Sequence, residues 1–309
     1  MSAITTEAQQ QLLQELKQQL PNLNITPNAV MAKYTTLHTG GPADLLAQPG
    51  DVEELRFLLV AAHAMQVPVT VIGHGSNLVV RDGGIRGLVI RIGREMRHVS
   101  IKDDLVTATA GTMLTVLAHE AASASLGGLV FASGIPGTVG GGVYMNAGAY
   151  GGDMSQVVIR VDGFDLAGLP FSYSRRECEF DYRHSRFQHE DKIISRVYFQ
   201  LPGGDREELM AQMVELNKRR AEKQPLTMPS AGSTFKRPEG HFAAALIDEC
   251  GLKGYTIGGA SVSEKHAGFC VNNGGTAKDF LDLIAHVQKV VYEEKGVRLE
   301  PEVRILGED

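Results

Sequence analysis

Three segments of the chain carry residue types that could do chemistry. Arg183 lies among aromatic residues in the segment 180–187, and its planar guanidinium could hold a carboxylate or a phosphate. Ser233 lies in a loop with a proline at each end, and its hydroxyl could give a proton to a developing carbanion within hydrogen-bond reach. Glu302 stands among Leu, Val and Ile, where a low dielectric would tune a carboxyl group for acid/base work.

Each of these residues also has an ordinary interpretation. Arg183 could be a surface arginine paired with Asp181. Ser233 could bond a neighbouring backbone N–H, as serines in loops do. Glu302 could be a solvated charge on an edge strand. Taken one at a time, the residues leave these alternatives open.

A glycine-rich segment, residues 134–152, is the strongest local signal in the chain. Glycine costs conformational entropy on folding, so this density requires a reason. The usual reason is a ligand whose phosphates are held by main-chain N–H groups. A flexible linker is disfavoured because Ile135, Val139 and Tyr144 are not linker residues. The segment therefore predicts a phosphate-bearing ligand.

The elements that must position these residues are predicted from apolar spacing and capping signals. Helices are expected over residues 6–20, 51–66, 113–126, 206–222, 243–250 and 277–295. Strands are expected over residues 45–46, 67–72, 78–80, 88–92, 105–110, 157–164, 171–173, 193–201, 268–271 and 297–305. Gly203 lies in a Pro-Gly-Gly turn that is typical of a domain boundary.

The turn that begins at Gly73 resembles a dinucleotide-binding fingerprint but does not match it. That fingerprint is GxGxxG opening a helix after the first strand. Gly73 and Gly75 are present, but Leu78 stands where the third glycine should be, and residues 78–80 have the composition of a strand. A Rossmann fold is therefore not expected.

Composition limits the class of protein. The chain has 309 residues, a net charge of −6 and three cysteines without a CxxC pair. The length suggests two or three domains, and the charge does not favour nucleic acid or an anionic membrane. The odd, widely spaced cysteines indicate reduced thiols in a cytoplasmic protein, and no histidine spacing suggests a metal site. No secretory signal or bilayer-spanning run is recognised.

Six motifs occur in order, over residues 39–44, 73–78, 134–152, 182–185, 231–236 and 299–302. Together they resemble the UDP-N-acetylenolpyruvoylglucosamine reductase family of bacterial peptidoglycan synthesis. The resemblance covers nearly the whole chain after the first thirty residues. Because a strand is expected soon after Arg183, the chain resembles the shorter form of the family, which lacks an added loop with a substrate-closing tyrosine.

The resemblance implies an α+β fold. It consists of a two-lobed FAD-binding domain of the vanillyl-alcohol-oxidase/PCMH type and a smaller α+β substrate-binding domain. The expected boundaries are an N-terminal helix in 1–30, a flavin domain in 31–203 with lobes 31–100 and 101–203, and a substrate domain in 204–309. Whether the last strand, 297–306, packs on the flavin domain is left open.

The resemblance also assigns residues. Catalysis falls to Arg183, Ser233 and Glu302, and substrate binding to Tyr182, Lys236 and Arg237. Non-covalent FAD would be held by Thr39, Gly40, Gly41, Gly73, His74, Gly75, Ser76, Asn77, Leu78, Gly134, Ile135, Pro136, Gly137, Thr138, Val139, Gly140, Gly141, Asn146, Ala147 and Gly148.

The activity implied is reduction of UDP-N-acetylglucosamine enolpyruvate to UDP-N-acetylmuramate with NADPH. Hydride would pass from reduced flavin N5 to the methylene carbon. The charge on the adjacent carbon would spread into the carboxylate, stabilised by Arg183 and Glu302, and Ser233 would protonate that carbon. No nucleic acid, membrane insertion, metal or obligate protein partner is expected.

Two other classes remain as alternatives. An FAD oxidase of the same fold, acting on an alcohol or lactone, would share the glycine-rich segment but need no nicotinamide donor. A flavin- or nucleotide-sugar-binding protein without turnover would bind FAD but be indifferent to loss of the Ser233 hydroxyl.

Overall fold

The computed structural model describes residues 6–309. Residues 1–5, which begin the segment expected over 1–30, lie outside the described residues. The described chain divides into two units, each with its own apolar core. The first unit holds the described residues up to Asn28, Asp44–His74 and Gly87–Lys218. The second holds Ala29–Ala43, Gly75–Arg86 and Arg219–Asp309, so two short early stretches group with the C-terminal third.

The first unit is built around two sheets. One has the strand order β1-β2-β5-β3, with β1 at Asn24–Val30, β2 at Pro42–Gln48, β5 at Ile85–Arg91 and β3 at Val69–Ile72. The other is antiparallel, with the order β11-β10-β12-β7-β6 and bounds Pro170–Ser174, Val158–Asp165, Lys192–Gln200, Leu105–Thr109 and Val99–Lys102. A two-stranded ribbon joins β8 (Gly148–Ala149) to β9 (Gly152–Asp153).

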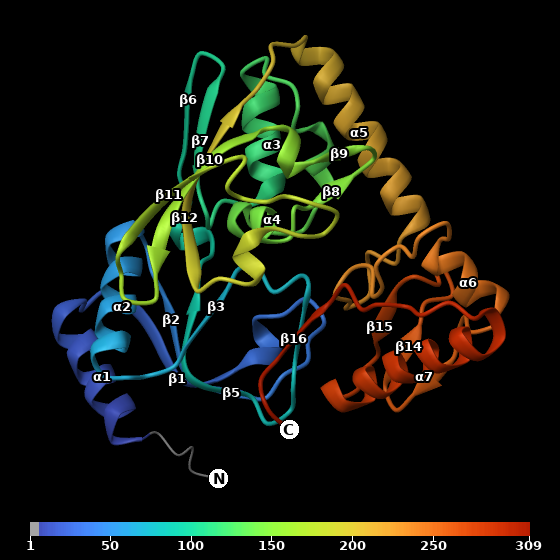
Figure 1. Ribbon diagram of the computed structural model, residues 1–309, viewed down its shortest axis with the longest axis horizontal. Coiled ribbons are helices and arrows are strands. Elements are labelled where there is room, and N and C mark those ends of the chain that lie inside the picture. The colour runs from blue at the N-terminus through green and yellow to red at the C-terminus, as the bar shows by residue number, and fades with distance from the viewer. Residues whose placement is uncertain (1–5) are drawn as a thin grey trace. The chain divides into compact units, whose positions relative to one another are not determined.

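In the described part of this unit the helices are α1 (Glu7–Gln19), α2 (Val52–Ala64), α3 (Leu114–Ser123), α4 (Val139–Tyr144) and α5 (Arg206–Lys223), and α5 ends in the second unit. Short 3-10 helices lie at Arg94–Met96, Val130–Gly134, Met154–Gln156 and Arg186–Gln188. Helix α4 contacts β12 and β7, and α3 contacts the 3-10 helix Val130–Gly134 (Figure 1). The glycine-rich segment is therefore packed directly against the core of this unit.

The second unit is smaller. Its three-stranded sheet has the order β13-β14-β15, with bounds Thr256–Ile257, Ala260–Val262 and Cys270–Asn272. Helix α7 (Ala277–Lys295) packs on this sheet and on α6 (Ala243–Glu249) (Figure 1). Strand β16 (Arg304–Leu306) pairs in parallel with β4 (Leu78–Val80), and a 3-10 turn lies at Met31–Lys33.

Most expected elements are present, and α7 has the expected ends. A Thr276/Asp279 capping box begins it, and Gly296 ends it with φ +69°. The strand expected over 297–305 is wrong for most of its length, because only Arg304–Leu306 pairs in a ladder. The sequence patterns did not predict β1, β6, β13, β14 or the short helix α4.

Asp44 links three parts of the first unit from a buried position. Its carboxylate accepts hydrogen bonds at 2.9 Å from the Gln9 side chain and from the Gly87 N–H, and Asp44 is 1% exposed. A buried carboxylate needs such donors because burial penalises its charge. The last residue of the 39–44 motif thus has a structural role.

Asp82 gives the first testable prediction. Its carboxylate accepts from the N–H groups of Ala277 and Lys278, both at 2.9 Å, and so caps the start of α7 from 195 residues away. Asp82→Ala is expected to lower the free energy of unfolding by about 1 kcal/mol, because two orphan N–H groups lose their acceptor. Thermal unfolding measures this. Asp282→Asn, which removes only an exposed i,i+4 pair with Lys278, is the control and should change little. Equal effects of the two substitutions would contradict the capping role.

The cysteines behave as expected for reduced thiols. All three are free, and Cys178 and Cys270 are buried. Burial raises the pKa of Cys178 to about 12 and that of Cys270 to about 11. Both therefore stay protonated and weakly nucleophilic near neutral pH.

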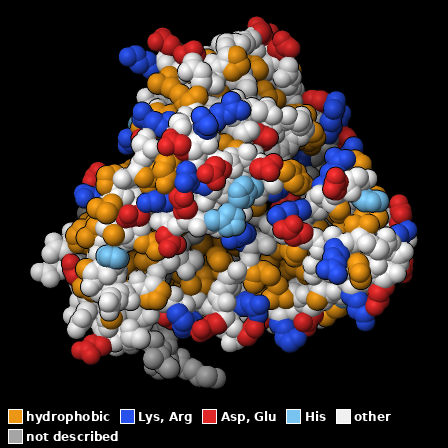
Figure 2. Space-filling view, viewed as in Figure 1, with side chains coloured by type: hydrophobic (Ala, Val, Ile, Leu, Met, Phe, Trp, Pro, Cys, Tyr) orange, Lys and Arg blue, Asp and Glu red, His pale blue; other side chains and the backbone are white. Residues whose placement is uncertain are grey.

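One face of the molecule carries charges of both signs. Acidic and basic side chains are interspersed across the face in Figure 2, in keeping with the modest net charge of −6. Among residues 6–309, no helix combines the length and apolarity needed to cross a membrane.

Candidate functional site

The glycine-rich segment folds around helix α4. Thr138 is its N-cap, with the hydroxyl accepting from the Gly141 N–H at 3.3 Å. The N–H groups of Val139 and Gly140 donate to carbonyls of Thr112 and Ala110 at 2.7 and 2.9 Å. The first amides of α4 are therefore satisfied within the chain. This differs from the expected arrangement, in which such amides face a phosphate.

Several glycines in the segment are required by packing against the chain itself. A Cβ built on Gly140 would lie 2.9 Å from the Cβ of Ala110, and one on Gly142 would lie 3.0 Å from the Leu114 side chain. A Cβ on Gly152 would lie 2.6 Å from the Phe131 ring. Real Cβ atoms almost never come within 3.0 Å of another atom because of van der Waals repulsion, so Gly140 and Gly152 exclude a Cβ, whereas at Gly142 the Leu114 side chain would have to shift slightly. Close packing thus explains much of the glycine density, while Gly141 is exposed with only Thr138 near it.

Gly73 gives the second prediction. Its built Cβ lies 2.5 Å from the Thr138 hydroxyl that caps α4. Gly73→Ala is expected to displace this hydroxyl, costing about 1 kcal/mol of stability through the lost cap and lowering the content of the FAD that the family resemblance implies. Absorbance at 450 nm against protein content measures the flavin. Gly203→Ala is the control, because nothing lies within 4 Å of its Cβ. Full flavin content in Gly73→Ala would contradict the prediction.

Two buried hydroxyls have no hydrogen-bond partner in the described structure. They are Thr39 Oγ1 in the second unit and Ser133 Oγ in the first, in residues 3% and 8% exposed. Buried polar groups are normally paired, so a ligand or an ordered water molecule is expected at each hydroxyl. Thr39 is among the predicted residues. Ser133 was missed, although its position directly before Gly134 could have drawn attention to it.

His74 lies in the first unit, next to Gly73. Burial, reinforced by the positive charge of Arg91, lowers its pKa below the ordinary value. The imidazole is therefore neutral near pH 7.

The second unit brings Ser233 and Glu302 onto adjacent stretches of backbone. Thr234, which comes directly after the exposed Ser233, is fully buried and accepts from the Glu302 N–H at 2.8 Å. Its hydroxyl accepts from the Cys270 N–H at 2.9 Å, anchoring the loop to β15. Buried, doubly bonded Thr234 therefore fixes the backbone on which Ser233 is displayed.

Asn77 holds the other side of Glu302. Its side-chain amide donates to the Glu302 carbonyl at 3.1 Å, and its own carbonyl accepts from the Arg304 N–H at 2.9 Å. Gly75 in the same segment accepts from the Thr36 N–H at 3.2 Å. Three of the predicted motifs thus meet within the second unit, around residues 75–78, 231–236 and 299–302.

The predicted substrate residues in this unit already have partners. Lys236 Nζ lies 2.6 Å from Glu300 Oε1. Arg237 donates to the His241 carbonyl at 3.2 Å, and its guanidinium stacks 3.9 Å from the centre of the Phe242 ring.

Arg183 lies in the first unit, in a turn closed by reciprocal backbone bonds between Asp181 and His184. Its φ of +52° is unusual for a residue with a branched or long side chain. The guanidinium donates to the Gly148 carbonyl at 3.0 Å, which connects it to the glycine-rich segment. Tyr182 beside it is half exposed. Residues 185–191, which include the 3-10 helix Arg186–Gln188, connect this turn to β12, so no long loop is inserted between them.

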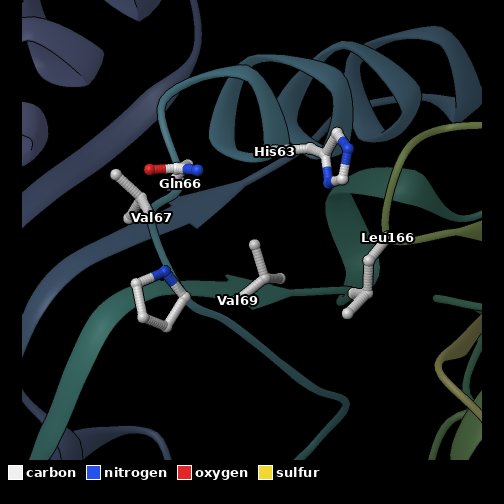
Figure 3. Close-up of a pocket in the computed structure, with 6 residues that line it drawn as sticks. His63, Gln66, Val67, Val69 and Leu166 are labelled. Carbon is white, nitrogen blue, oxygen red and sulfur yellow. The ribbon is translucent and has the colours of Figure 1, made fainter.

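The first unit also has an open depression of about 290 Å³, which is separate from the predicted site residues (Figure 3). It lies at the end of α2 and is lined by His63, Gln66, Val67, Pro68, Val69 and Leu166. None of the residues predicted from the sequence lines it.

Known proteins match this chain in both of its parts. Residues 224–306 match the family model for the UDP-N-acetylenolpyruvoylglucosamine reductase C-terminal domain, and residues 43–168 match an FAD binding domain. UDP-N-acetylenolpyruvoylglucosamine reductase from Lactiplantibacillus plantarum is 49% identical, covering 94% of this chain and 96% of its own length. The enzyme of that name from Limosilactobacillus fermentum is 50% identical, covering 93% and 96%.

A solved structure agrees. The crystal structure of UDP-N-acetylenolpyruvylglucosamine reductase from Thermus caldophilus matches with a TM-score of 0.79 and 37% identity, over 93% of this chain and 99% of that one. The α+β fold with a flavin domain of the vanillyl-alcohol-oxidase/PCMH type is thereby confirmed. Since half of the residues are shared over almost the full length of both chains, this chain belongs to the UDP-N-acetylenolpyruvoylglucosamine reductase family of FAD-dependent oxidoreductases.

Proposed function

We propose that this chain reduces UDP-N-acetylglucosamine enolpyruvate to UDP-N-acetylmuramate with electrons from NADPH, in the cytoplasm. The observation that carries the proposal is the pairing of the Ser233 loop with Glu302 through the bond from Glu302 N–H to Thr234 O. This bond places the loop that carries Ser233 beside the segment that carries Glu302, and the protonation of a carbanion requires such a positioned proton donor.

The residues present fit an FAD cofactor. The unpartnered buried hydroxyls of Thr39 and Ser133 suit the polar groups of a bound cofactor. We propose that they hold it together with the other predicted residues of 39–41, 73–78 and 134–148. Reduced FAD, when bound, supplies a hydride from N5 for the methylene carbon of the enolpyruvyl ether.

The protein stabilises the charge that this reaction creates. Negative charge develops on the carbon next to the carboxylate and spreads into that carboxylate. We propose that the Arg183 guanidinium holds the carboxylate by charge-assisted hydrogen bonds, and that the Glu302 carboxyl group, in its protonated form, donates a further hydrogen bond to it. The Ser233 hydroxyl then gives its proton to the carbanionic carbon and regains one from solvent.

Recognition of the nucleotide sugar falls to other side chains. We propose that Lys236 and Arg237 attract its phosphates, with Lys236 exchanging its Glu300 partner for a phosphate oxygen. Tyr182, half exposed next to Arg183, offers an aromatic surface and a hydroxyl.

The electron donor can be tested with the purified holoenzyme under anaerobic conditions. NADPH alone is expected to bleach the flavin absorbance, whereas NADH at equal concentration should act more slowly. An oxidase of the same fold would show no reduction by NADPH and rapid reduction by an alcohol or lactone. That result would overturn the proposed donor.

A further inference from the structure

Gln188 binds two carbonyl groups in the first unit. Its side-chain Nε2 donates to the carbonyl of Arg183 and to the carbonyl of Tyr144, both at 3.0 Å. Tyr144 is the last residue of α4, and Arg183 is the predicted carboxylate-binding arginine. One side chain therefore connects the end of the cofactor-segment helix to the arginine turn.

The side-chain amide of Gln188 is suited to binding two carbonyl groups. A primary amide nitrogen has two hydrogens and no acceptor capacity, so it can donate to both carbonyls at once, with Met145 Sδ as a more distant acceptor at 3.8 Å. If the Gln188 side chain moved away, both carbonyls would lose the hydrogen bond that it donates. Gln188 lies on the 3-10 helix Arg186–Gln188, and its own N–H donates to the Ser185 carbonyl at 3.1 Å, which fixes its base.

The turn that Gln188 holds needs such support. Arg183 has a φ of +52°, in the left-handed region that side chains other than Gly, Asn and Asp rarely occupy. Such conformations persist only where surrounding contacts impose them, and they cluster at functional sites.

Two further side chains tie the same turn to the glycine-rich segment. Asn146 donates to the Asp181 carbonyl at 2.9 Å, and Ser185 donates to the Tyr144 carbonyl at 2.7 Å. Gln188 differs from both because it alone, among these three, bonds the backbone of Arg183 itself. Through this bond Gln188 holds the backbone from which the Arg183 side chain extends.

We propose that Gln188 is a positioning residue for the reductase reaction, setting the Arg183 backbone on the end of α4 so that the guanidinium meets the substrate carboxylate. The inference rests on the proposed role of Arg183. Gln188 touches neither substrate nor cofactor in this proposal. It acts through Arg183, in the half-reaction in which substrate reoxidises the flavin.

Gln188→Glu tests the proposal, because it keeps the shape and removes both donors. Stopped-flow measurements of the holoenzyme are expected to show reoxidation of reduced flavin by UDP-N-acetylglucosamine enolpyruvate slowed by about 10- to 100-fold. Flavin reduction by NADPH should be unchanged. Gln188→Lys, whose ammonium can donate to both carbonyls, should restore much of the rate. Gln212→Glu, an exposed glutamine on α5, is the control for added charge.

The second arm repeats the substitution in an Arg183→Ala background. If Gln188 acts through Arg183, Gln188→Glu will cause no further slowing there. Equal slowing in both backgrounds, no slowing in either, or parallel loss of flavin content and of both half-reactions would overturn the proposal. Gln188→Met, uncharged and of similar length, repeats the test without repulsion between carboxylate and carbonyls. A normal rate in Arg183→Ala alone would refute the proposed role of Arg183, whereas a slow Arg183→Ala beside a normal Gln188→Glu would refute only the role of Gln188.

Discussion

Ser233→Ala is expected to slow reoxidation of the reduced flavin by UDP-N-acetylglucosamine enolpyruvate by about 10²–10⁴-fold, the usual contribution of a positioned proton donor. The loop should keep its shape, because it is held by the backbone and hydroxyl of buried Thr234. Flavin content, thermal stability and reduction by NADPH should therefore stay unchanged. Stopped-flow absorbance at 450 nm separates the two half-reactions.

Ser230→Ala is the matched control for this loop. Ser230 is anchored through its backbone, by its N–H to the Thr36 carbonyl at 3.1 Å and by its carbonyl to the Thr36 hydroxyl at 2.6 Å. Its hydroxyl has no assigned role, so the rate should be close to that of the unchanged protein. If Ser233→Ala reoxidises as fast as Ser230→Ala, the proton comes from another group.

Arg183→Ala is expected to lower the rate of the same half-reaction by about 10²–10³-fold, the effect of removing a donor aimed at developing charge. The loss should appear in the maximal rate of reoxidation as well as in substrate affinity, because the negative charge on the substrate grows as hydride arrives. Arg183→Lys should recover only part, since an ammonium cannot hold a carboxylate with two parallel bonds.

Arg176→Ala controls for loss of a positive charge in the same region, since Arg176 is exposed. It should leave both half-reactions unchanged. If Arg183→Ala raised only the substrate concentration needed for half-maximal rate, Arg183 would be a binding residue without a part in the chemistry.

The sequence predicted long amphipathic elements well because their signals are local. Helix α7 shows an apolar stripe, a Thr276 cap and a terminal Gly296, and all three lie within the element or at its ends. The motifs likewise identified the family, because recognising them requires only their residues and their order along the chain.

Local signals failed where long-range contacts decide the structure. Glu302 was expected on a strand, but it is held by Thr234 and Asn77, which lie 68 and 225 residues away in the chain. The glycine-rich segment was assigned to ligand contact, and its sequence did not show that a Cβ on Gly140 or Gly152 would also collide with Ala110 or Phe131. The periodicity of apolar residues along the chain does not identify contacts between residues that are far apart in the sequence.

Supporting polar residues were missed for the same reason. Gln188 comes after a turn and resembles any surface glutamine, and only its two bonds to carbonyls distinguish it. Asp44 belonged to a recognised motif, but its buried bonds to Gln9 and Gly87 could not be read from the motif.

The most direct test of the proposed reaction is a single turnover without oxygen. Holoenzyme whose FAD has been fully reduced by one equivalent of NADPH is mixed with one equivalent of UDP-N-acetylglucosamine enolpyruvate. The flavin absorbance should recover within the reaction, and mass spectrometry should find UDP-N-acetylmuramate, two hydrogens heavier than the substrate. Flavin that stays bleached until air is admitted, with the enolpyruvyl sugar unchanged, would contradict the proposed function.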